Sequence, residues 1–363
     1  MRWPTFSKKP PAFLDPKNRR GNKEDQANVQ RETEGDISKF KLNHIMMFDE
    51  TIREIDRCLR TCRFGTQYAK LYSGQYSDRF DELPEFVNVC KKNDVTPCIG
   101  GGQTEAAIKE GRLLSYVQEL DRLGIDTIEI SNSLGDTPPC DDRTSVKSLC
   151  RDFREVLIEI GTKNNRQYQT RDEWKRDLDF ALENNASKII LEGTGVGEGG
   201  IYNYKGAPNN LLVTELMQRA GDRKDRLLLE APRLDQQAYW THELFGWNVG
   251  LGNLPPDVEA LQKTDALRLN AMKPDVISTI ERRRNAHAEL LQELLSVCEQ
   301  ESIDPNLAVF HDYFHATEAD DMVRFSDWKI RLREGLVALS RQPSPPRVAI
   351  PRIIQAIIDM LRD

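Results

Sequence analysis

Glutamate recurs at one kind of position in this sequence, at or beside the carboxyl end of a short β-rich run. Four consecutive runs, the fourth to the seventh, carry such a residue: Glu129, Glu159, Glu192 and Glu230. The carboxyl ends of parallel strands meet at one edge of a sheet or one mouth of a barrel, so the four carboxylates would be neighbours. Their mutual repulsion is costly unless a divalent cation or basic side chains offset it.

The type of ligand indicates which cation would suit such a cluster. No set of His and Cys residues accompanies the glutamates, and oxygen ligands favour a hard cation such as Mg²⁺. The alternative is that each glutamate pairs with a Lys or Arg of a neighbouring strand inside the protein. The sequence leaves both interpretations open.

Two glycine-rich stretches follow strand candidates and offer exposed backbone N–H groups, which suit an anion. The first, Gly100 to Gln103, leads into a helix, and the second runs from Gly193 to Tyr202. Neither matches the dinucleotide fingerprint or the phosphate loop of nucleotidases, and glycine also serves tight turns. The turn at 250–253, which ends at Asn253, lies where many barrels hold phosphate.

The runs that end at these residues alternate with helical stretches, which indicates repeated strand–helix units and a parallel sheet. The strand candidates are 44–48, 68–72, 95–99, 126–130, 156–160, 188–192, 226–230 and 248–251. Helices are expected at 84–92, 104–123, 145–154, 171–184, 209–220 and 236–245. This alternation predicts an α/β fold, a (β/α)8 TIM barrel, with an open doubly wound sheet as the alternative.

The barrel is expected to occupy residues 44–271, with a further segment on each side. Residues 1–43 are rich in Pro, Lys, Arg, Asn and Glu, which is typical of a disordered or draped N-terminal arm. Its aromatic residues could instead anchor it to a partner subunit. Residues 272–363 show apolar positions at helical spacing and predict a helical C-terminal extension that packs on the barrel or on another subunit. We expect a homo-oligomer.

Composition narrows the class of partner. The 363 residues are 39% hydrophobic and 30% charged, with a formal net charge of -7, which argues against nucleic acid. No apolar run approaches the length of about 20 residues that spans a membrane. The seven cysteines form no CxxC pair and no secretory signal pattern accompanies them, so we expect a cytoplasmic, reducing location. The expected partners are therefore small molecules.

The strand ends also carry a resemblance to a known family. The matching stretches are Lys70, PCIGGGQTE (97–105), LGIDTIEIS (123–131), LIEIG (157–161), IILEG (189–193), GGIY (199–202), LLEAPRLDQQ (228–237) and FGWNVGLGNL (245–254). In this order they resemble the phosphosulfolactate synthase family, the enzymes of coenzyme M biosynthesis that add sulfite to phosphoenolpyruvate. The resemblance covers the chain from about His44 to Leu269.

The resemblance implies a (β/α)8 barrel that uses Mg²⁺, nucleophilic addition at the methylene carbon of an enolpyruvate, and protonation of the neighbouring carbon. On that basis the metal ligands are Glu159, Glu192 and Glu230, and the catalytic residues are Lys70, Lys163 and Glu129. The predicted substrate-binding residues are Gly101, Gly102, Gln103, Ser131, Gly199, Gly200, Gln236, Gln237 and Asn253. The substrate is expected to be a small anionic carboxylate or a phosphorylated compound.

Several family patterns differ in this chain. The paired lysines are Thr162-Lys163, and the Arg-Glu-Ser run is Thr194-Gly195-Val196, which removes a guanidinium that could hold phosphate. The sequence thus predicts a phosphosulfolactate synthase-like lyase acting on phosphoenolpyruvate, another enolpyruvate or a small carboxylate, with sulfite or a related nucleophile. One alternative is a non-catalytic, stress-related scaffold that binds proteins, as suggested for plant relatives linked to heat-stress tolerance. Another is an aldolase with a Schiff base at Lys70 or Lys163.

Overall fold

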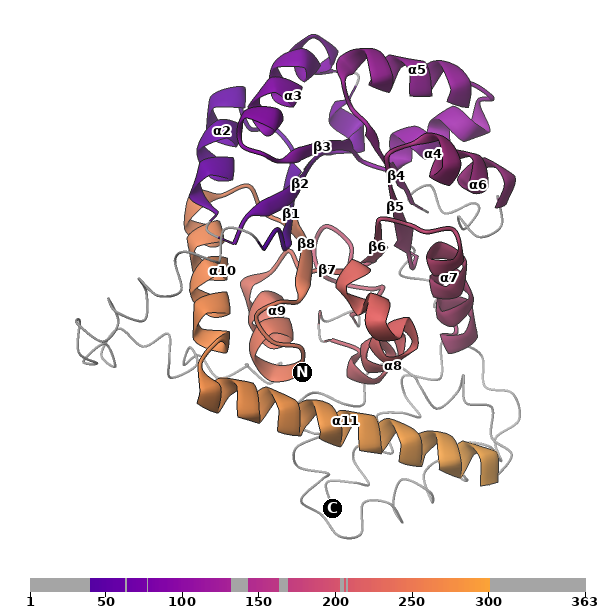
Figure 1. The fold of residues 1–363 in the computed structure, drawn as a ribbon, viewed down its shortest axis with the longest axis vertical. Coiled ribbons are helices and arrows are strands. Elements are labelled where there is room, and N and C mark those ends of the chain that lie inside the picture. The colour runs from indigo at the N-terminus through magenta and orange to yellow at the C-terminus, as the bar shows by residue number, and fades with distance from the viewer. Residues whose placement is uncertain are drawn as a thin grey trace, which may run out of the picture.

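The strands of this protein form a barrel in the computed structural model, which describes residues 40–62, 64–76, 78–131, 143–162, 169–202, 206 and 208–300. Eight parallel strands make one sheet in the order β3-β2-β1-β8-β7-β6-β5-β4. Their bounds are β1 Asn43–Met47, β2 Thr66–Leu71, β3 Thr96–Ile99, β4 Thr127–Ile130, β5 Glu155–Ile160, β6 Lys188–Leu191, β7 Leu227–Glu230 and β8 Gly250–Leu254. The sheet curls round on itself inside a ring of helices (Figure 1), so the predicted (β/α)8 TIM barrel is confirmed.

The barrel is nearly closed at the junction of β3 and β4, the two ends of the strand order. These strands lie next to each other (Figure 1). The backbone N–H of Gly101, just beyond β3, donates a hydrogen bond of 2.9 Å to Glu129 Oε1 on β4. A side chain of β4 thus holds the turn that follows β3.

The helices alternate with the strands as predicted. Their bounds are α2 Ile52–Thr61, α3 Leu83–Lys92, α4 Gly102–Lys109, α5 Leu113–Leu123, α6 Arg143–Asp152, α7 Arg171–Glu183, α8 Asn210–Ala220, α9 Leu234–Ala238, α10 Val258–Ala271 and α11 Pro274–Gln300. Capping boxes begin α2 at Thr51 and α7 at Thr170, where each threonine side chain accepts a hydrogen bond from the backbone of the third helical residue.

Two of the helix predictions were wrong in detail. The single helix expected at 104–123 is two helices, because Gly111 has a positive φ of 68° and ends the first of them. The helix expected at 236–245 is α9 followed by a π-helix, η6 Tyr239–Leu244. Helices α2 and α10 were not among the predicted helices.

Alternate residues of each strand face the inside of the barrel. Along four of the strands, one inward-facing residue is part of a buried cluster and the next inward-facing residue is charged. Five buried side chains form a small cluster of their own, which we call the floor cluster: Tyr68, Cys98, Leu157, Ile190 and Leu228. Residues of the other parity, such as Ile158 and Leu229, belong to the large core between the strands and the helices. On β2, β5, β6 and β7, the residue two positions after the floor cluster is charged: Lys70, Glu159, Glu192 and Glu230.

Helix α11 lies beyond the barrel helices and packs against α8 and η6 (Figure 1). Ile280 is 3% exposed, and Arg283 forms an ion pair with Glu243 of η6. Residues 1–39 and 301–363 lie outside the described residues, so the division into 1–43, 44–271 and 272–363 stays a prediction. Among the helices that are described, none has both the length and the apolar character to cross a membrane.

Candidate active site

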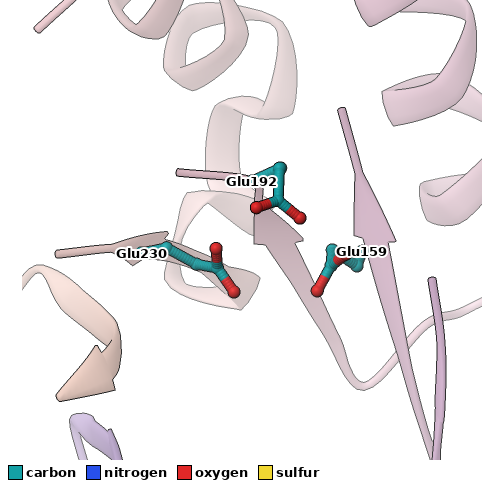
Figure 2. Close-up of side chains that lie close together, drawn as sticks. All are labelled: Glu159, Glu192 and Glu230. Atoms are coloured by element: carbon teal, nitrogen blue, oxygen red, sulfur yellow. The ribbon is translucent and has the colours of Figure 1, made fainter. Parts of the chain in front are cut away.

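Three glutamates converge at the C-terminal ends of three successive strands (Figure 2). Glu159 lies near the end of β5, Glu192 directly follows β6, and Glu230 ends β7. Each offers a carboxylate oxygen, and these oxygens all lie within 4.8 Å of one another. The side chains are 2%, 0% and 0% exposed, respectively. We call Glu159, Glu192 and Glu230 the glutamate triad.

Backbone N–H groups orient two of the three carboxylates. Gly193 N–H donates to Glu230 Oε2 at 2.9 Å, and Thr194 N–H donates to Glu192 Oε1 at 2.5 Å. The side-chain amide of Asn253 donates to the other oxygen of Glu230. The sequence left open whether the glycine-rich turn after β6 holds an anion or serves a tight turn, and these N–H groups bind the protein's own carboxylates.

Lys70 lies beside the triad and is 2% exposed. Its ammonium nitrogen is 3.1 Å from Glu129 Oε2 and 4.0 Å from Glu230 Oε1. Glu129 therefore follows the alternative interpretation of the sequence, since it pairs with a basic side chain of another strand. Lys163, the second predicted basic group, lies outside the described residues.

Electrostatic repulsion among the buried carboxylates is a cost that this site must offset. Lys70 brings one positive charge to the carboxylates of Glu129 and the triad. Burying carboxylates at this separation without compensation is strongly unfavourable. The triad presents oxygen ligands alone and fits a hard divalent cation, which would remove most of that repulsion.

The predicted substrate-binding residues after β3 and β4 are packed together. A Cβ atom on Gly101 would lie 2.5 Å from Ser131 Oγ, so this approach requires glycine. Ser131 donates to Glu105 Oε1 at 2.5 Å. Gly102 and Gln103 begin α4, and the Gln103 amide donates to Ser73 O at 2.7 Å. These contacts join the turns after β2, β3 and β4.

Gly199 and Gly200 shape the turn that carries Glu192. A Cβ atom on Gly200 would lie 1.9 Å from the carbonyl oxygen of Glu192, and both glycines have positive φ values, 80° and 61°. Their geometry gives them a role in positioning the triad. A contact of either with substrate stays a prediction.

The two predicted glutamines bind other parts of the protein. The amide of Gln236 donates to Gly197 O at 2.8 Å and to Gly206 O at 3.2 Å, which ties α9 to the loop after β6. The amide of Gln237 donates to Ala231 O at 3.0 Å, and its oxygen accepts a hydrogen bond of 2.6 Å from Thr264 Oγ1 of α10. Among the nine predicted substrate-binding residues, Asn253 donates a side-chain hydrogen bond to a triad carboxylate, that of Glu230.

Sequence reasoning missed His44, which lies inside the barrel on β1 and is 0% exposed. Burial, and secondarily the nearby Lys70 ammonium, holds the pKa of His44 well below its usual range, so the imidazole is neutral near pH 7. The strand candidate at 44–48 is otherwise apolar, and the only available signal was that residue 44 has the inward-facing parity of its strand.

The sequence analysis also did not single out Tyr202 as a site residue, although Tyr202 lies within the stretch GGIY that resembles the family. Its hydroxyl donates to Glu230 O at 2.5 Å and accepts a hydrogen bond of 2.7 Å from Trp240 Nε1. Trp240 belongs to the π-helix η6, and such irregular turns are frequent near functional sites. The pair supports the backbone of Glu230 from the helix side.

The sequence of this barrel is similar to those of known enzymes. A sequence profile of the (2R)-phospho-3-sulfolactate synthase (ComA) family matches residues 41–273. The chain is 30% identical over 182 residues to the phosphosulfolactate synthase of Methanothermobacter thermautotrophicus, which covers 49% of this chain and 69% of that protein. It is 26% identical over 180 residues to the phosphosulfolactate synthase of Methanocaldococcus jannaschii, with coverage of 49% and 70%.

Solved structures show a more distant similarity. Thiamine phosphate pyrophosphorylase from Pyrococcus furiosus aligns with a TM-score of 0.42 at 7% identity, over 65% of this chain and 98% of that one. A likeness at this level identifies neither a ligand nor a reaction.

Proposed function

Because the chain belongs to the phosphosulfolactate synthase family of enzymes, we propose that it is a Mg²⁺-assisted lyase that adds sulfite or a related sulfur nucleophile to phosphoenolpyruvate or a similar enolpyruvate. The observation that carries the proposal is the glutamate triad, three buried carboxylates beside Lys70 at the C-terminal end of the barrel. Barrel enzymes place their chemistry at this end.

Glu159, Glu192 and Glu230 would hold the metal. When bound, Mg²⁺ would neutralise the substrate carboxylate and stabilise the negative charge that develops on it during addition. The hydrogen bonds from Gly193 and Thr194 hold Glu230 and Glu192 in place before any substrate arrives. Such preorganisation removes the cost of reorienting the ligands during the reaction.

Lys70 is the candidate proton donor. In the proposed step, a lone pair of the sulfur nucleophile forms the C–S bond at the methylene carbon. The electron pair of the C=C bond moves to the neighbouring carbon, which takes a proton from the Lys70 ammonium. Glu129, 3.1 Å from Lys70 Nζ, holds that ammonium in position.

The loop after β6 bears on which acceptor is used. Where the family has Arg-Glu-Ser, this chain has Thr194 to Val196. Thr194 donates from its hydroxyl to Glu198 O at 2.7 Å, and Val196 is 64% exposed. A phosphate would therefore find no guanidinium from these three residues. We infer that the substrate carboxylate contributes more to binding than its phosphate does.

The test is direct. Purified protein with Mg²⁺, phosphoenolpyruvate and sulfite is followed by ³¹P NMR and mass spectrometry for phosphosulfolactate, with sulfide and a thiol as further nucleophiles. Parallel reactions use the Glu192→Gln variant and, as a matched control, Glu183→Gln on the exposed surface of α7. We expect turnover in the wild type and in the control and none with Glu192→Gln. If none of these nucleophiles consumes phosphoenolpyruvate, the proposed reaction is wrong.

A further inference from the structure

His44 presents a buried polar group that the proposed reaction does not use. It pairs with Tyr68 across β1 and β2, and the two rings meet edge to face with centroids 6.2 Å apart. Among the described residues, neither ring nitrogen of His44 has a hydrogen-bond partner. A neutral imidazole has one donor and one acceptor nitrogen, and buried polar groups nearly always find partners in protein or ordered water.

The space next to His44 borders the triad. A Cβ atom added to Gly252 would lie 3.5 Å from His44 Nδ1 and 3.5 Å from Glu230 Cγ. Gly252 is also the residue that pairs with Glu230 across β7 and β8. Because residue 252 has no side chain, nothing from that position separates the imidazole from the glutamate.

A β-bulge places a second buried polar residue opposite His44 in the strand register. Asn43 pairs with Leu251 and Ile45 pairs with Leu254, so two residues of β8, Gly252 and Asn253, stand opposite His44 alone. Asn253 has a φ of 51°, and its amide nitrogen donates to Glu230. Its amide oxygen is buried and has no hydrogen-bond partner in the described part of the chain. Bulges beside active sites often redirect a side chain in this way.

We propose that this bulge holds an internal water molecule that connects His44 with Glu230 and Asn253, which makes His44 a positioning residue for the glutamate triad. A water molecule both donates and accepts, so it can serve an imidazole nitrogen together with a carboxylate or amide oxygen. Buried waters make about three hydrogen bonds, which matches this set of groups. The neutral form of His44 suits the role, since a second cation beside Lys70 would be repelled.

The consequence for function rests on the proposed metal site. Groups that form hydrogen bonds with a metal-ligating side chain fix its orientation, and their loss typically weakens metal binding by about 10- to 100-fold. His44 would act on the metal through Glu230, without touching it. The internal water itself does not depend on the proposed reaction.

The experiment compares three variants with a matched control, measuring Mg²⁺ affinity by calorimetry and thermal unfolding without metal. His44→Phe removes both nitrogens at similar volume, His44→Gln keeps a donor and an acceptor, and Gly252→Ala places a methyl group between His44 and Glu230 at ordinary contact distances. The control is His242→Phe, which replaces a buried imidazole whose Nε2 lies 2.7 Å from Leu267 O, away from the triad.

We expect His44→Phe and Gly252→Ala to weaken Mg²⁺ binding by about 10-fold or more and to lower the unfolding temperature. His44→Gln should stay within about threefold of the wild type, because it restores the hydrogen bonds, and the control should lose stability without losing Mg²⁺ affinity. The opposite result, a higher unfolding temperature for His44→Phe and for Gly252→Ala with unchanged Mg²⁺ affinity, would show a dry site and overturn the proposal.

A crystal structure of the metal-free wild type separates this proposal from the proposed function. An ordered water within hydrogen-bond distance of His44 supports the inference even if the protein binds no Mg²⁺, in which case it is the metal site that fails. Well-defined density around His44 without a water rejects the inference and leaves the proposed reaction intact.

Discussion

The floor cluster and the glutamate triad share β5, β6 and β7, where their residues are two positions apart, and they differ in polarity and charge. Leu157, Ile190 and Leu228 fill the inside of the barrel with apolar side chains. Two positions later on β5, β6 and β7, Glu159, Glu192 and Glu230 bring three buried carboxylates together. The first layer stabilises the fold by excluding water, and the second is costly for the fold unless a cation is present. The residues that stabilise the fold and the residues proposed to bind the metal thus form two successive layers along these strands.

The largest effect is expected from replacing a glutamate of the triad. Glu159→Gln should lower turnover by about 1,000-fold, because it removes a metal ligand and the charge stabilisation that depends on it. The same change should leave the metal-free protein equally or more stable, since it relieves repulsion among the carboxylates. Steady-state kinetics and urea unfolding of the same preparation give both values. A variant that loses stability and keeps its activity would assign Glu159 to the structural layer.

Lys70 tests the charge balance of the same layer. Lys70→Met should lower the free energy of unfolding by about 3–5 kcal/mol, because Glu129 loses its buried partner. The double variant Lys70→Met/Glu129→Gln should recover part of that loss, since it leaves no unpaired charge between the two positions. Lys175→Met is the matched control, because Lys175 pairs with the exposed Asp172 and should change stability by about 1 kcal/mol or less. Equal losses for Lys70→Met and the control would contradict the buried pair.

The floor cluster should respond in the opposite sense to the triad. Leu228→Ala should cost about 3 kcal/mol of unfolding free energy, because it leaves a cavity in a cluster where Leu228 is 1% exposed. Mg²⁺ affinity should remain close to that of the wild type. If the free energy of Mg²⁺ binding falls by as much as the free energy of unfolding, the two layers are coupled and do not have separate roles.

The smallest effect is the stabilisation of the whole protein by metal. Mg²⁺ at 100 times its dissociation constant should raise the free energy of unfolding by about 2.7 kcal/mol, and EDTA should reverse the change. Leu228→Ala should show the same increment and Glu192→Gln little or none. Thermal unfolding across a Mg²⁺ series measures it, and Ca²⁺ is the comparison ion. An equal increment with Glu192→Gln would place the metal elsewhere.

Much of the fold was predictable because local patterns determine it. The eight strand candidates lie within two residues of the strands at nearly every boundary, since each is a short β-rich run bounded by turn residues. Helix breaks were less predictable. The split at Gly111 depends on a single residue with a positive φ. The π-helix η6 packs against α10 and α11, and the residue pattern does not encode these contacts.

The sequence predicted which glutamates form the candidate site, but it did not predict which groups bind them. The positions of Glu159, Glu192 and Glu230 after successive strands predicted that they would meet, because parallel strands end at one face of a barrel. Glu129 has the same position on its strand, yet it pairs with Lys70 and the N–H of Gly101. Which carboxylate finds a lysine depends on distances across the barrel.

The sequence alone determined the strand–helix alternation, the position of four glutamates at the ends of successive strands and the resemblance that led to the family. These properties are local in the chain, or depend on the order of short stretches along it. Only the tertiary structure decided that the glycine-rich turns direct their N–H groups at the protein's own carboxylates, and that a bulge in β8 sets Gly252 and Asn253 beside His44. Barrel closure and strand register bring residues hundreds of positions apart into contact, and no local pattern carries that information.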